Sequence, residues 1–321
     1  MSINSKTRKI LSVCFVLACY VGLYFISKDN FNKLKNFQFS DLLFFDGSLL
    51  SLCCCLVGAN WFLEAVKWRI SLIPIEKISL KNSFIGVLKG IPISLFTPNR
   101  IGEALGRPTV LKEENRISGA FATVYCGLSQ MPIMMLFGVF SCVYFSFSTH
   151  GFSKAQFLTS DWFIILGFVL TVIVFLCYFF PEYLIPFVKN RKKTNWVSKL
   201  KFFCKYNCRE KIMLLLFSFF RYFVYSLQNY FAIASFGLEI NFLEGLASVF
   251  LIYALMSFVP RPALLELGVR CSASVAILSR YTSDFTIPTI SSVFVWCVNL
   301  FFPALIGTAL YLFVRRFHLK F

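Results

Sequence analysis

Long apolar stretches separated by short charged segments run through the whole chain. A transmembrane helix needs about 17–25 predominantly apolar residues, and six stretches reach that length: residues 10–26, 48–66, 118–146, 162–180, 212–236 and 288–314. Two further apolar stretches, residues 80–97 and 246–259, are shorter and are interrupted or closed by Pro and charged residues. The pattern predicts an all-α integral membrane protein with about six transmembrane helices and two broken, re-entrant helical elements.

Composition agrees with a membrane location. Only 15% of the 321 residues are charged and 58% are hydrophobic, whereas soluble domains carry about 25% charged residues. The net charge of +17 raises nucleic acid as a partner, but the basic residues flank the apolar stretches, where the positive-inside rule accounts for them. We therefore expect one polytopic membrane domain over residues 1–321 and no nucleic-acid partner.

The distribution of basic residues also predicts the orientation. The most basic segment, residues 181–211, divides the chain into a first half, residues 1–180, and a second half, residues 212–321. Basic loops face the cytoplasm, so six spans place both termini on the cytoplasmic side of the cytoplasmic membrane. The two halves then form an inverted repeat, and their broken elements enter from opposite faces. Such paired, interrupted segments are typical of transporter binding sites.

The two broken elements end in similar motifs. Each has Phe-x-Pro, then a Glu, and then an Arg four residues after that Glu: Glu103 with Arg107, and Glu266 with Arg270. On a helix this spacing places both side chains on one face, and ionisable residues within a membrane are usually functional. Arg100 and Arg261 lie just before the two glutamates. The simpler alternative is that each Glu and Arg only neutralise one another at a helix end.

A polar stripe follows the fifth span. Ser218, Arg221, Tyr222, Tyr225, Gln228 and Asn229 are spaced to share one helical face. The stripe predicts a wet bundle interior, although a snorkelling Arg221 is the simpler interpretation of that one residue. Glu64, near the end of the second span, is expected to be an interfacial residue rather than a buried site.

The chain offers little for metal or covalent chemistry. Most of its 12 Cys lie in apolar runs, where Cys acts as a small hydrophobic residue, and its two His, His150 and His318, are isolated. We expect no metal and no cofactor. A transferase needs a general base or a nucleophile, and Glu103 is the only plausible base. We therefore expect that the protein is not an enzyme.

Several segments resemble the lysylphosphatidylglycerol synthase/flippase transmembrane family over nearly the whole chain. They are residues 66–68, 96–107, 221–228 and 266–270, and Pro-x-Arg-x-Gly-Glu at residues 98–103 is the most specific of them. The resemblance implies a bilayer domain that translocates aminoacylated phospholipid, or in some relatives one linked to glycolipid or polyprenyl-phosphate chemistry.

The chain departs from this family in three ways. It lacks the soluble aminoacyl-transfer domain of the full-length synthases, so lysine transfer itself is not expected. The second motif has Ala263-Leu264 where many relatives carry Gly-Gly, and the third span has Ser129-Gln130 where many carry an acid–Arg pair. These changes leave the head group open.

The leading hypothesis is a lipid translocase for a phosphate-containing phospholipid or glycolipid, aminoacylated or not. Its candidate substrate-binding residues are Arg100, Glu103, Arg107, Arg221, Tyr225, Gln228, Arg261, Glu266 and Arg270. Anionic or aminoacylated head groups are the expected partners. The alternatives are a membrane-embedded glycosyl- or acyltransferase and a non-catalytic assembly subunit. Transport direction, energy source and oligomeric state, including a homo-oligomer, stay open.

Overall fold

Helices dominate the computed structural model, which describes residues 45–97, 100–147, 160–184, 202–258 and 263–318. Within these ranges four helical stretches are long and apolar enough to cross a membrane: Gly47–Ser71, Glu113–Phe147, Asp161–Phe179 and Thr286–Leu312. They correspond to the second, third, fourth and sixth predicted spans, so the prediction of an all-α membrane protein is confirmed. The first predicted span, residues 10–26, and Arg261 lie outside the described residues.

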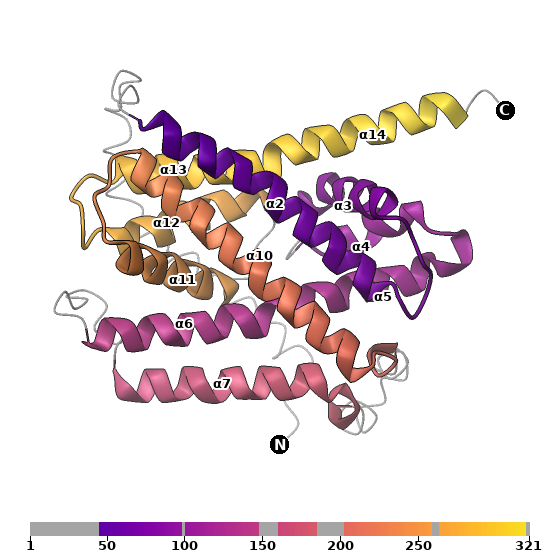
Figure 1. Cartoon of the computed structure of the whole chain (residues 1–321), viewed down its shortest axis with the longest axis horizontal. Helices are drawn as coiled ribbons and strands as arrows, with labels where there is room; N and C mark the ends of the chain where they lie inside the picture. The colour runs from indigo at the N-terminus through magenta and orange to yellow at the C-terminus, as the bar shows by residue number, and fades with distance from the viewer. Residues whose placement is uncertain (1–44, 98–99, 148–159, 185–201, 259–262, 319–321) are drawn as a thin grey trace, which may run out of the picture.

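Two long antiparallel helices, α2 (Gly47–Ser71) and α10 (Cys208–Ser235), run side by side through the centre of the molecule (Figure 1). The Asp46 side chain caps α2, and Asn207 and Glu210 form a capping box at the start of α10. The Asp46 amide donates to the Ser235 carbonyl (2.9 Å). At the opposite end, the Tyr206 hydroxyl donates to the Ser71 carbonyl (2.7 Å). The start of each helix is therefore tied to the end of the other.

The first broken element folds back on itself. Helix α3 (Leu80–Ser94) is followed by a turn, the short helix α4 (Glu103–Gly106) and the 3-10 turn η2 (Arg107–Val110). Fifteen residues of α3 span about 22 Å, less than a hydrocarbon core of about 30 Å. A Cβ on Gly106 would lie only 2.6 Å from the Lys89 carbonyl oxygen, so glycine is needed where α4 packs against α3.

The third and sixth spans are both broken near their middles. The third divides at Ser129 into α5 (Arg116–Leu128) and α6 (Gln130–Phe147). The sixth consists of α13 (Thr286–Trp296), a π-helical turn (Cys297–Phe301) and α14 (Phe302–His318). Such π turns inside α-helices are frequent at functional sites.

The second half repeats the packing of the first in the same chain order. Helix α10 packs against α11 (Phe242–Phe258) and α13, as α2 packs against α3 and α5. Helix α11 packs on α6, and α3 packs on α14; α12 (Ala263–Leu278) contacts α11 and α13, as α4 contacts α3 and α5. In Figure 1, α3, α4 and α5 lie on one side of the α2–α10 pair, and α11 and α12 lie on the other. Because α2 and α10 are antiparallel, exchanging the halves inverts them, which is the arrangement of an inverted repeat.

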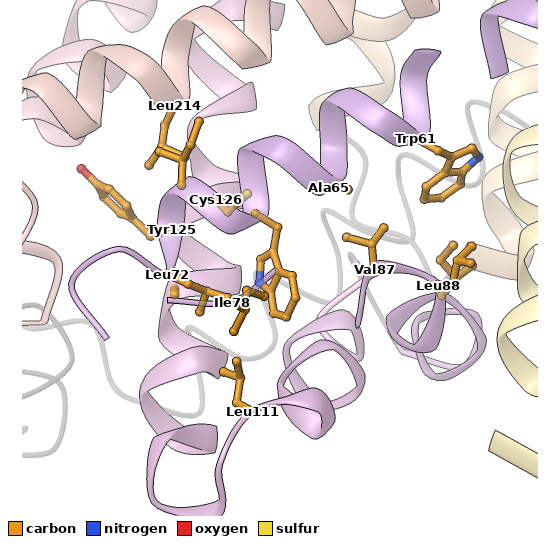
Figure 2. Packing of buried hydrophobic residues seen from close by; sticks show 14 of the residues in the cluster. Trp61, Ala65, Leu72, Ile78, Val87, Leu88, Leu111, Tyr125, Cys126 and Leu214 are labelled. Carbon is orange, nitrogen blue, oxygen red and sulfur yellow. The ribbon is translucent and has the colours of Figure 1, made fainter. Parts of the chain in front are cut away.

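The core of the bundle is apolar, and so is part of its outer surface. Buried apolar side chains, among them Trp61, Val87 and Leu88, fill the space between α2 and α3 (Figure 2). By contrast α7 (Asp161–Phe179) buries only Thr171 and Tyr178. Many of its large apolar side chains are exposed, among them Ile165, Phe168 and Ile173, so we interpret its outer face as lipid-facing.

The predicted orientation can be tested by labelling single cysteines introduced into a Cys-free background. We expect Glu239→Cys to react with a membrane-impermeant maleimide in intact cells, and Lys205→Cys to react only after permeabilisation. Both side chains are exposed, so neither is protected by protein packing. External labelling at position 205 would contradict the six-span topology.

Candidate functional site

A buried carboxylate on α2 lies at the centre of a charged cluster. Glu64 is 4% exposed; its Oε1 pairs with Arg107 Nη2 (2.7 Å) and its Oε2 with Arg221 Nε (3.1 Å) and Lys67 Nζ (3.5 Å). The prediction of an interfacial Glu64 is therefore wrong. The helix continues to Ser71 rather than ending at residue 66, so Glu64 lies two turns inside it and faces α10 and η2.

Arg107 is shared between two carboxylates. Besides Glu64 it pairs with Glu103, the predicted partner four residues earlier in the chain. The Arg107 side chain is only 4% exposed and that of Glu103 is 17% exposed. Gly90 makes room for the arginine, because a Cβ there would lie 2.7 Å from Arg107 Cγ. The pair is thus part of a wider network and not only a local helix bridge.

The break between α5 and α6 supplies uncharged partners to this cluster. Gln130 Oε1 accepts long hydrogen bonds from Lys67 Nζ and Arg221 Nη1, both at 3.5 Å. Its Nε2 donates to the Ser218 carbonyl (3.2 Å), and the Ser129 and Ser218 hydroxyls lie 2.8 Å apart. The cluster therefore joins α2, α6, α10 and η2.

A second cluster surrounds Glu266 on α12. Arg270 Nη2 pairs with Glu266 Oε1 (3.0 Å) and donates to the Tyr225 hydroxyl (2.7 Å), and its Nη1 donates to the Tyr253 hydroxyl (2.6 Å). Arg100 joins from the first half through Nε (3.2 Å) and Nη2 (3.0 Å) to the same carboxylate. One ion pair thus links the two broken elements, 166 positions apart in sequence.

Arg100 also has unusual backbone geometry. Its φ is +56°, and it is the one non-glycine residue with positive φ among those described. Placing a residue that has a Cβ in the left-handed region of positive φ costs about 1–2 kcal/mol. Such backbone strain tends to occur at functional sites. The bidentate contact with Glu266 holds the strained turn in place.

Gln228 lies apart from both clusters, in a ladder of buried amides. Its Oε1 accepts from Asn299 Nδ2 (3.0 Å), and Asn299 Oδ1 accepts from Asn60 Nδ2 (2.9 Å). Asn299 belongs to the π-helical turn, so the ladder joins α10, α2 and the sixth span. Gln228 is fully buried and is better explained as a packing contact than as a group exposed to substrate.

The two clusters contain more positive than negative charge. Their ion pairs involve five cationic side chains, Lys67, Arg100, Arg107, Arg221 and Arg270, and three carboxylates, Glu64, Glu103 and Glu266. Buried charges in a membrane are normally compensated. Within the described part of the chain, the excess of two positive charges therefore favours an anionic ligand.

Access to the clusters is uneven. The side chains of Arg100 and Arg221 are 33% and 22% exposed, whereas those of Arg107 and Arg270 are 4% and 3% exposed. The first two guanidinium groups can therefore meet a ligand, while the two buried ones set the local charge.

Most of the charged residues in the two clusters were predicted from the sequence. Of the predicted site residues, Glu103, Arg107 and Arg221 lie in the first cluster, and Arg100, Tyr225, Glu266 and Arg270 lie in the second. The residues that were missed include Glu64, Lys67, Gln130 and Tyr253. The signal for Glu64 was present, since an acid within an apolar span is a functional candidate by default.

Comparison with known proteins identifies the family of this chain. No curated protein and no solved structure matches the chain. The family model for the lysylphosphatidylglycerol synthase TM region matches residues 10–307, nearly the whole chain. The family suggests a membrane protein of lipid metabolism or transport. The buried polar clusters between two broken elements agree with this match, and the chain belongs to the lysylphosphatidylglycerol synthase TM region family.

Proposed function

We propose that the protein is a lipid translocase of the cytoplasmic membrane, with both termini cytoplasmic, and that it moves a phosphate-containing phospholipid or glycolipid between leaflets. The observation that carries the proposal is the excess positive charge of two clusters that the inverted halves share. A phosphate cannot enter hydrocarbon without compensation for its lost hydration. Guanidinium groups at membrane depth supply that compensation.

The position of the first cluster along α10 supports a transport site. Helix α10 has 28 residues, and Arg221 lies at its middle, about 20 Å from Cys208 by helix geometry. If a hydrocarbon core about 30 Å thick is centred on α10, the first cluster lies near its middle. Substrate sites of transporters built from inverted repeats lie at this depth.

The arrangement also suggests how the head group binds. A phosphate oxygen can replace Glu64 or Glu266 as partner of the partly exposed Arg221 or Arg100, because carboxylate and phosphate present similar acceptors to a guanidinium. Glu103, also partly exposed, is placed to meet an ammonium group if the lipid is aminoacylated. All three carboxylates are already engaged in ion pairs with Lys67 or arginine side chains, so a translocase is favoured over a transferase.

The test is a pair of substitutions at Arg221, assayed with purified protein in liposomes that contain a fluorescent anionic phospholipid. We expect Arg221→Leu to reduce the translocation rate at least tenfold. Arg221→Lys should keep part of the activity, because the charge survives and the bidentate fork does not. Arg116→Leu is the control, since Arg116 pairs with Glu113 on the surface. Normal translocation by Arg221→Leu would contradict the proposal.

A further inference from the structure

An apolar cavity of about 340 Å³ lies away from the charged clusters, between α6, α7 and α11. Its walls are almost entirely apolar; Val139, Gly167, Leu170 and Leu255 are among them. Thr171 carries the one hydroxyl of the lining, and that hydroxyl already donates to the Gly167 carbonyl (2.7 Å). The cavity offers nothing to a polar head group.

Two glycines shape this cavity. A Cβ on Gly138 would collide with the Ala254 Cβ, so α6 and α11 meet closely there. A Cβ on Gly167 would lie 3.1 Å from Val139 Cγ2, so α6 and α7 also approach closely. The cavity is the space that remains between these two helix contacts. It reaches the outside beside α7, where Leu166, a lining residue, is 46% exposed.

The dimensions limit what can occupy the cavity. Its lining covers residues 135–142 of α6 and 163–171 of α7, which is about 10–12 Å along each helix axis. A helix that crosses the membrane is about 30 Å long, far longer than this. A hydrocarbon chain confined to one leaflet has a matching length, about half of the bilayer core.

We propose that the cavity between α6, α7 and α11 binds one acyl chain of a bilayer phospholipid. The first half of α7 lines it, and the basic segment follows the other end of α7. The bound acyl chain therefore lies in the leaflet opposite the basic segment. The exposed apolar face of α7 puts lipid next to the opening, and the apolar lining selects hydrocarbon over water. This inference does not require that the protein translocates lipid.

The test uses full-length protein in nanodiscs with a phosphatidylglycerol that carries a diazirine on its acyl chain. After illumination, mass spectrometry should find the label on residues 135–142 and 163–171. Val139→Trp fills the cavity and should lower that labelling at least fivefold. Val169→Trp is the matched control, because Val169 lies on the exposed face of α7 and does not line the cavity. Equal labelling of the two variants would overturn the proposal, as would a disulfide between two copies of a Val139→Cys variant, which would put a second protein copy in the cavity.

A second comparison, with Arg221→Leu, shows which lipid the bound acyl chain belongs to. If it belongs to a lipid whose head group occupies the charged clusters, Arg221→Leu will also reduce labelling. If it belongs to a resident bilayer lipid, Arg221→Leu will leave labelling unchanged. Either result supports the acyl-chain site. Loss of cavity labelling only in Val139→Trp, with no translocation by the wild-type protein, would support the site while contradicting the translocase.

Discussion

Replacing Glu64 with Gln is expected to lower the free energy of unfolding by about 3–5 kcal/mol, the range for breaking a buried ion pair. The carboxylate is the shared partner of Lys67, Arg107 and Arg221. Without it, Glu103 alone would face these three cations within the cluster. The measurement is the unfolding free energy by SDS titration in mixed micelles.

A second substitution distinguishes charge balance from lost packing. Lys67→Met in the Glu64→Gln background removes one cation and returns the cluster to its original net charge, so we expect partial recovery of stability. Glu113→Gln serves as the control, because its pair with Arg116 is exposed and should contribute about 0–1 kcal/mol. Similar losses in Glu64→Gln and Glu113→Gln would mean that the first cluster does not depend on its buried carboxylate.

Replacing Arg270 with Gln is expected to abolish translocation while the protein still inserts and folds. Folding survives because Glu266 keeps its bidentate partner, Arg100. Transport fails because the second cluster then holds one cation and one carboxylate, and no longer attracts an anion. The translocation rate in liposomes and the yield of monodisperse protein are measured together.

Two variants sharpen this test. Arg270→Lys keeps the charge, but a single ammonium cannot reproduce the fork that contacts Glu266, Tyr225 and Tyr253, so we expect an intermediate rate. Arg116→Gln, on the surface, should transport normally. If Arg270→Gln transports at the wild-type rate, the Glu266–Arg270 pair is only a helix bridge.

The sequence by itself predicted the helical elements well, because apolar runs and their interruptions depend on local composition. The polar stripe from Ser218 to Asn229 was visible in the residue pattern. In the structure the stripe faces inward, whereas Phe219, Phe220 and Phe223 are exposed. Helical periodicity decides which side chains share a face, so no tertiary information was needed.

The ion-pair partners of the charged residues were harder to predict than the helix faces on which they lie. The spacing of Glu103 with Arg107 and of Glu266 with Arg270 correctly indicated that the members of each pair are in contact. It gave no sign that Arg107 also binds Glu64, or that Arg100 crosses to Glu266. Those contacts join segments 43 and 166 positions apart, and local spacing carries no information about such pairs.

Taken alone, the sequence determined that this is a membrane protein made of helices, with two broken elements and a polar helix face, since each of these follows from the order of apolar and polar residues. The tertiary structure decided which charges meet. It placed Glu64 among three cations and set Gln228 in a ladder with Asn60 and Asn299. The physical reason is that α2 and α10 pack side by side as antiparallel partners, and only this packing brings their polar faces and the two broken elements together.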